Sequence, residues 1–224
     1  MTETFTGTMR RECAAIWEAQ LTHPFLVALG DGTLPQETFQ FYIVQDARFL
    51  TDLAKTFAFA ATKTSDRDRA KVLAERLINT VNVERALHEG YAAHFGMTPE
   101  EMAAVPMAPT NYAYTRHILQ IGAMGSLAET LTAMLPCAWI YAVVGRHFTA
   151  QGEPPGEHPY RDWLLTYANV EFEAVGVWMR GVIDDEASRL DASGHERLRD
   201  IFRTSSRYEY MFWEMAWTRE SWPV

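Results

Sequence analysis

Apolar residues recur along this chain at spacings of three and four, and the strict alternation typical of strands is scarce. The pattern predicts short helices near 24–29 and 98–104 and long helices over most of the remaining chain. We expect the long helices at 8–21, 34–62, 67–95, 111–121, 125–150, 157–182 and 194–218. The sequence therefore predicts an all-α helical bundle.

Turn and capping residues separate the predicted helices. Gly30-Asp31-Gly32 is typical of a turn, and Thr33-x-x-Gln36 and Thr98-x-x-Glu101, each with an internal proline, are typical of helix starts. Loops are expected at 106–110, with Thr110 as a helix N-cap, and at 152–156. No linker is long enough to divide the chain, so the sequence predicts one domain covering all 224 residues.

Composition narrows the function classes. A chain of 224 residues with 48% hydrophobic residues can bury one sizeable core. The net charge of -9 argues against nucleic acid or an anionic membrane as a partner. Two cysteines are too few for a disulfide framework and no signal peptide is visible, so we expect a cytoplasmic protein. The longest apolar stretch, around 133–145, contains Pro136 and is interpreted as a core helix rather than a membrane span.

Polar residues interrupt the apolar faces of several predicted helices. Asp46 lies within the apolar face of 34–62, Tyr167 within that of 157–182, and Glu209 within that of 194–218. An ionised carboxylate in a core costs several kcal/mol unless partners satisfy it. Such residues on different helices indicate a shared polar cavity with shifted pKa values, as acid–base sites have.

Structural interpretations remain open for each of these residues. Asp46 or Glu209 could be the centre of a structural hydrogen-bond network. Glu84 and His88, on the apolar face of 67–95, are four residues apart and could pair within their helix. Cys137, in the apolar run Leu135 to Tyr141, could be inert core.

Pro136 gives Cys137 a second interpretation. A proline inside a helix removes one backbone donor and pushes on the carbonyl four residues earlier, here that of Thr132, so it kinks the helix beside the thiol. A nucleophilic thiol needs a base or a field that lowers its pKa, and no histidine lies near Cys137 in sequence. A carboxylate such as Glu209 could serve, and this pairing suits addition to an electron-poor ring.

Cofactor chemistry has little support in the sequence. A di-metal carboxylate bundle needs Glu-x-x-His motifs, and this chain has none. Haem ligation by a lone histidine such as His88 has no specific support, and no phosphate-binding loop is present. No cofactor and no metal are therefore expected.

Six segments in a fixed order resemble the TenA family, also called thiaminase II or aminopyrimidine aminohydrolase, from about residue 8 to 222. These segments are His23-Pro24-Phe25, the run Gly30 to Pro35, Tyr42-Ile-Val-Gln-Asp46, Pro109-Thr-Asn-Tyr-Ala-Tyr114, Leu135-Pro-Cys-Ala-Trp139 and Tyr208-Glu-Tyr-Met-Phe-Trp213. The resemblance implies a haem-oxygenase-like bundle without haem, usually a homotetramer. Its implied activity is hydrolysis of the C–N bond at the methylene attached to 4-amino-2-methylpyrimidine, in thiamine salvage.

The resemblance also implies residue roles. Cys137 matches the nucleophile and Glu209 the acid/base, while Asp46 matches the carboxylate that holds the aminopyrimidine edge. Active-site aromatic residues are matched by Phe49, where some relatives have tyrosine, and by Tyr114, Tyr141 and Tyr167. The resemblance gives no role to Glu84 or His88, and the preferred leaving group, ammonia or the thiazole of thiamine, stays open. Two alternatives also remain: a non-catalytic pyrimidine carrier or regulator, and a metal-dependent oxidase on the same bundle.

Overall fold

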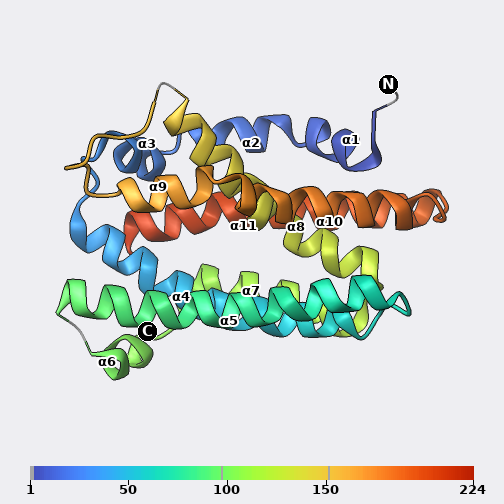
Figure 1. The fold of residues 1–224 in the computed structure, drawn as a ribbon, viewed down its shortest axis with the longest axis horizontal. Helices are drawn as coiled ribbons and strands as arrows, with labels where there is room; N and C mark the ends of the chain where they lie inside the picture. The colour runs from blue at the N-terminus through green and yellow to red at the C-terminus, as the bar shows by residue number, and fades with distance from the viewer. Residues whose placement is uncertain (1–2, 97, 151) are drawn as a thin grey trace. The chain divides into compact units, whose positions relative to one another are not determined.

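The protein is all-α, as the hydrophobic pattern predicts. The computed structural model describes the backbone of residues 3–96, 98–150 and 152–224, and their side chains except those of 83–89, 91–95, 99 and 103. Throughout these residues the regular structure is helical, with no strand. In chain order (Figure 1) the helices are α1 (Phe5–Glu12), α2 (Ala14–Leu21), α3 (Pro24–Asp31), α4 (Gln36–Ala61), α5 (Arg67–Phe95), α6 (Pro99–Ala104), α7 (Pro109–Met124), α8 (Leu127–Thr149), α9 (Arg161–Ala168), α10 (Val170–Ala187) and α11 (Ala192–Thr218).

The chain forms two compact units. Unit 1 comprises Met1–Leu34 and Leu131–Glu214, and unit 2 comprises Pro35–Thr130 and Met215–Val224. Unit 1 thus holds α1 to α3, α9, α10 and most of α8 and α11. Unit 2 holds α4 to α7 with the C-terminal tail.

Two predicted helices are each divided in the structure. The helix expected at 8–21 is interrupted at Cys13, which leaves helical geometry with φ -99° and ψ 14°. The helix expected at 157–182 ends at α9, and the extended Asn169 then caps α10 by accepting a hydrogen bond from the Glu171 amide at 2.8 Å. Asparagine is a preferred N-cap, so the second break has a sequence signal that helical periodicity overrode.

The division at Asn169 corrects the apolar face predicted for 157–182. Trp163 is buried in α9, whereas Val170 and Val177 of α10 are 75% and 49% exposed. The apolar face of the predicted helix 67–95 also differs from the expectation at one described position, because Leu73 is buried but Val81 is 41% exposed.

Helix starts were predicted with mixed success. Thr98 and Glu101 form the expected capping box at the start of α6. The prediction that Thr110 caps α7 is wrong, because the helix already begins at Pro109. The Thr110 amide instead donates a hydrogen bond to the Glu220 carboxylate of the C-terminal tail at 2.9 Å.

In unit 2, α4 is the central helix and packs against both α5 and α7, which lie alongside it in Figure 1. Its buried face includes Phe39, Tyr42, Ile43, Phe49 and Phe57. The predicted apolar stripe of α4 therefore lies in the interior of unit 2, together with Asp46, the polar residue that interrupts it.

In unit 1, buried polar contacts join α2 to α11. Gln20 donates from Nε2 to the Ser206 carbonyl at 3.1 Å and accepts at Oε1 from the Trp213 indole at 2.6 Å. The Trp17 indole donates to the Ser206 hydroxyl at 3.1 Å. Because these bonds lie on one face of α11, they fix the rotation of the helix that carries Glu209.

Helix α8 is long and apolar enough to cross a membrane by length and composition, and within the described residues it alone meets that test. Of its most apolar 18-residue window, 72% is buried within the protein. Core helices of soluble proteins pass the same test, so the burial fits the interpretation of this stretch as core. Pro136 lies inside this helix, as the sequence pattern predicts.

Candidate active site

The Asp46 carboxylate is buried on α4. Its residue is 6% exposed on the inner face of α4. Among the described side chains and backbone groups, none forms a hydrogen bond or ion pair with this carboxylate. Burial raises its pKa to about 7. A carboxyl group in this state can bind a ligand either as an acid or as a carboxylate near neutral pH.

Two of the predicted aromatic residues meet in unit 2. The rings of Phe49 on α4 and Tyr114 on α7 have centroids 4.9 Å apart at an interplanar angle of 37°. Both residues are buried. Phe49 is three residues beyond Asp46 on the same face of α4, so the structure groups the three predicted recognition residues of unit 2.

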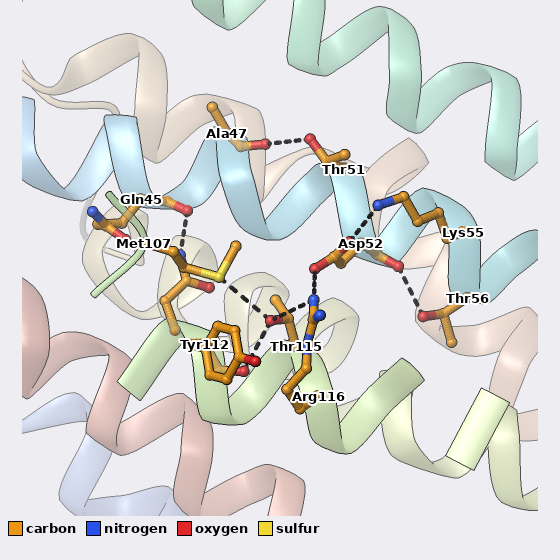
Figure 2. A network of polar contacts seen from close by, with 11 residues as sticks. Gln45, Ala47, Thr51, Asp52, Lys55, Thr56, Met107, Tyr112, Thr115 and Arg116 are labelled. Atoms are coloured by element: carbon orange, nitrogen blue, oxygen red, sulfur yellow. Dashed lines mark hydrogen bonds and ion pairs between the residues drawn. The ribbon is translucent and has the colours of Figure 1, made fainter. Parts of the chain in front are cut away.

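Gln45 and Asn111 join these two helices, and the sequence analysis gave neither a role. Both are fully buried. The Asn111 amide donates to the Gln45 carbonyl at 2.7 Å and to Gln45 Oε1 at 3.1 Å. Figure 2 shows Gln45 beside the loop residue Met107 that precedes α7. Both residues lie within the family motifs named above. The sequence signal that could have identified them is a polar residue at a helical position that faces a neighbouring helix.

In unit 1, Cys137 is half-buried on α8, immediately after the buried Pro136. Neither Cys137 nor Cys13 is in a disulfide. The residues preceding Cys137 on the same helix, from Leu131 to Leu135, are all buried. Cys137 is thus the first residue of this stretch with an accessible side chain, as a nucleophile requires.

A cluster of aromatic rings lies on α8, α9 and α11. Tyr141 packs edge-on against Tyr167 with ring centroids 4.7 Å apart, and its ring is tilted against that of Trp213 with centroids 5.0 Å apart. Trp163 lies 4.6 Å from Tyr167. The structure therefore brings Tyr141 and Tyr167 together, and Tyr141 is one helical turn beyond Cys137.

Glu209 lies on the buried face of α11 and is 2% exposed. The apolar face predicted for this helix is confirmed, since Leu198, Phe202 and Phe212 are buried on the same face. Trp213, one turn beyond Glu209, is bonded to Gln20. This contact and the bond at Ser206 secure the helix on either side of Glu209.

His23, from the first recognised motif, also holds α11. Its Nδ1 accepts the Phe25 amide proton at 3.1 Å, so its Nε2 carries the proton that bonds Glu214 at 3.0 Å. Burial lowers the pKa of His23, and Glu214 opposes that shift. His23 is therefore a neutral anchor for α11 rather than a proton-transfer group.

Glu84 and His88 have helical backbones in α5, but their side chains lie outside the described part of the structure. Among the side chains that are described, no group of three or more histidine, cysteine or acidic residues is placed to hold a metal ion.

The fold and these residues define a helical-bundle protein whose unit 2 holds a buried carboxylate and whose unit 1 holds a half-buried thiol, each unit with its own group of packed aromatic rings. The profile of the TENA/THI-4/PQQC family matches residues 10–219. The chain belongs to this family, which confirms the resemblance drawn from its motifs.

Relatives of known name cover nearly the whole chain. An aminopyrimidine aminohydrolase of Halalkalibacterium halodurans is 36% identical over 220 residues, with 97% of each chain covered. Another of the same name from Bacillus subtilis is 34% identical, covering 97% of this chain and 92% of the relative. The expectation of an enzyme that hydrolyses C–N bonds agrees with these names.

Solved structures support the fold. A TenA homologue from P. horikoshii OT3 has a TM-score of 0.86 and 33% identity, covering 96% of this chain and 99% of that one. A domain from Shewanella denitrificans described as having a haem-oxygenase-like fold has a TM-score of 0.63 at 13% identity, covering 95% and 91%. The predicted haem-oxygenase-like architecture is confirmed.

Proposed function

We propose that this protein is an aminopyrimidine aminohydrolase. It hydrolyses the C–N bond at the 5-methylene of 4-amino-5-aminomethyl-2-methylpyrimidine, and that of thiamine, to give 4-amino-5-hydroxymethyl-2-methylpyrimidine. The structural observation that carries the proposal is the buried Asp46 carboxyl group, for which the described residues supply no partner. The names of the close relatives supply the reaction class.

Asp46 suits the edge of a 4-aminopyrimidine. That edge presents a ring nitrogen that accepts a hydrogen bond beside an amino group that donates one. A protonated carboxyl group complements both, because its hydroxyl donates and its carbonyl accepts. The pKa of about 7 allows Asp46 to hold this proton near neutral pH and to share it with the ring nitrogen. Phe49 and Tyr114, with their rings adjacent, provide apolar faces beside the same turn of α4.

In the proposed reaction, the Cys137 thiolate adds to a ring carbon while the ring nitrogen accepts a proton. The resulting enamine pushes electrons toward the methylene, and the C–N bond breaks as Glu209 protonates the departing amine. Water then adds to the methylene and gives a proton to Glu209. Return of the ring-nitrogen proton to Asp46 and expulsion of the Cys137 thiolate restore the aromatic ring, so the net reaction is replacement of the amine by hydroxide with one water consumed.

The decisive experiment measures turnover of the aminomethyl pyrimidine and of thiamine by the purified full-length protein. Equal release of ammonia and hydroxymethyl pyrimidine supports the proposal, and the two kcat/KM values identify the preferred leaving group. Binding without turnover would instead favour the carrier or regulator. Stoichiometric iron in active protein would favour the oxidase.

We also propose that the enzyme acts in thiamine salvage as a cytoplasmic homotetramer. Reduced cysteines, neither in a disulfide, fit that compartment. The exposed valines of α10, Val170 and Val177, with exposed Ala174 between them, form an apolar strip that a second copy could cover. Light scattering of purified protein tests the assembly, and a monomeric mass at working concentration would reject it.

A further inference from the structure

Gln45 and Asn111 connect the two helices that carry the aminopyrimidine-recognition residues. Gln45 directly precedes Asp46 on α4, and Asn111 lies one turn before Tyr114 on α7. Building on the proposed function, we propose that this buried amide pair positions Asp46 and Phe49 relative to Tyr114 and thereby sets the affinity for the aminopyrimidine ring. Neither side chain is assigned a chemical step.

The pair uses three of its four amide groups. Gln45 Oε1 accepts hydrogen bonds from the Ala108 amide at 2.9 Å and from Asn111 Nδ2 at 3.1 Å. Gln45 Nε2 donates to the Pro106 carbonyl at 3.0 Å. One side chain of α4 therefore fixes both the loop that enters α7 and the first turn of α7 itself. This matters because Ala108, the N-cap of α7, provides no side-chain cap.

The second bond of Asn111 reaches the backbone of the recognition turn. Its Nδ2 donates to the Gln45 carbonyl at 2.7 Å. In an α-helix that carbonyl also accepts the amide of the residue four positions on, here Phe49. Asn111 is thus bonded to the same turn that carries Asp46 and Phe49, and a change at Asn111 shifts those side chains relative to Tyr114.

Stability alone does not account for asparagine at position 111. Its Oδ1 is buried and has no hydrogen-bond partner among the described residues. A buried acceptor without a partner lowers stability, so an apolar residue of similar size would be the better choice for packing alone. The donor Nδ2 is the functional part of this side chain in the protein.

The same two helices provide a matched control. Two turns along α4 from Gln45, the Asp52 carboxylate forms ion pairs with Arg116 of α7 and with Lys55, the latter at 2.7 Å. Figure 2 shows this second connection separate from Gln45 along α4. It also joins α4 to α7, but it lies beyond the turn that carries Asp46 and Phe49. Removing it tests helix pairing without touching the recognition turn.

The test compares Asn111→Leu and Gln45→Glu with Arg116→Met in the full chain. Gln45→Glu keeps the accepting oxygen but replaces the donor to Pro106 by a second oxygen. Steady-state kinetics with the aminomethyl pyrimidine are measured beside the melting temperature of each variant. We expect Asn111→Leu and Gln45→Glu to raise KM about tenfold with kcat within about twofold of wild type. Arg116→Met should leave KM unchanged at a comparable loss of melting temperature.

Equilibrium binding of the hydroxymethyl pyrimidine to Cys137→Ser protein, with and without Asn111→Leu, gives a readout independent of turnover. The inference predicts the same tenfold loss in Kd. The inference is overturned if Asn111→Leu lowers kcat about tenfold and leaves KM unchanged, or if it leaves Kd unchanged. It is also overturned if Arg116→Met raises KM as much as Asn111→Leu does. If Asn111→Leu does not fold, the same criteria apply to Gln45→Glu. Failure of wild-type protein to turn over the pyrimidine would reject the proposed function itself, which these variants do not decide.

Discussion

Gly145 on α8 lies directly against the backbone of Tyr167 on α9. A β-carbon at position 145 would come within 2.3 Å of the Tyr167 carbonyl carbon and 2.4 Å of the Ala168 nitrogen. Only glycine permits this approach, because real β-carbons do not come so close to backbone atoms. The contact holds α9 against α8 where Tyr167 packs on Tyr141, which lies one helical turn beyond Cys137.

The first prediction concerns this contact. Gly145→Ala should lower the free energy of unfolding by about 1–3 kcal/mol, because the clash is with backbone that must move as a unit. It should also lower kcat/KM, since the movement displaces Tyr167. Urea denaturation and steady-state kinetics measure the two effects. Gly181→Ala is the control: a β-carbon there meets nothing within 4 Å, so the change should be neutral or stabilising by up to about 1 kcal/mol.

The second prediction concerns the proposed nucleophile. Cys137→Ser should lower kcat by at least about a hundredfold, because a serine hydroxyl without an adjacent strong base is a far poorer nucleophile than a thiolate. Binding of the hydroxymethyl pyrimidine should persist. Cys13→Ser is the control, since Cys13 is buried and burial raises its thiol pKa. Full activity in Cys137→Ser would reject covalent catalysis.

A third prediction separates two glutamates on α11. Glu209→Gln should reduce kcat by about 10²- to 10³-fold with a smaller change in KM, because a buried amide cannot transfer protons. Glu214→Gln lies five residues on, where the exposed carboxylate is hydrogen-bonded to His23, so its kcat should stay within about threefold of wild type. Equal losses in the two variants would assign Glu209 to structure rather than proton transfer.

Sequence reasoning succeeded where helical periodicity was continuous. The faces containing Asp46 and Glu209 are buried as predicted, because a long amphipathic helix has one way to bury its stripe. Sequence reasoning failed at Asn169, where α9 ends and α10 begins. The apolar residues at the start of α10 continue the 3.6-residue period, although they face outward. Periodicity records an apolar stripe but does not identify the surface that covers it.

The contacts around the candidate site were beyond the sequence for another reason. Gln45 and Asn111 are separated by 66 residues, and nothing in either helix alone shows that one amide donates to the other. The closeness of Gly145 to Tyr167 likewise depends on how α8 packs against α9. The motifs include Gln45 and Asn111, but only the tertiary structure shows that the two side chains are paired.

The fourth prediction addresses Phe49, which replaces the tyrosine of some relatives. Phe49→Tyr should change kcat/KM by less than about threefold, because the aromatic face beside Tyr114 is retained. Stability should fall by about 1–2 kcal/mol, since the new hydroxyl enters a buried position. Parallel kinetics and thermal denaturation check both effects. A large gain in rate would show that the missing hydroxyl belongs to the reaction.

The last prediction follows from the raised pKa of Asp46, about 7 against an ordinary value of 3.8. Because burial favours the neutral acid, the folded protein loses stability from this group as the pH rises from about 4 through 7, and carries the full penalty above 7. Asp46→Asn removes the ionisation. The variant should therefore gain about 1–4 kcal/mol relative to wild type at pH 8, and much less at pH 5, in urea denaturation.

The same group should give substrate binding its pH dependence. Wild-type KM for the aminomethyl pyrimidine should rise above pH 7, because the proton shared by Asp46 and the ring nitrogen is then lost. In Asp46→Asn the KM should be about tenfold higher and no longer rise across that range, since an amide presents a donor and an acceptor at every pH but cannot pass a proton to the ring. Kinetics between about pH 6 and 8.5, a range that spans the pKa of about 7, test this directly. Two results together would show that Asp46 does not hold the shared proton. One is a wild-type KM that stays constant across this pH range, and the other is a stability difference between wild type and Asp46→Asn that is the same at pH 5 and pH 8.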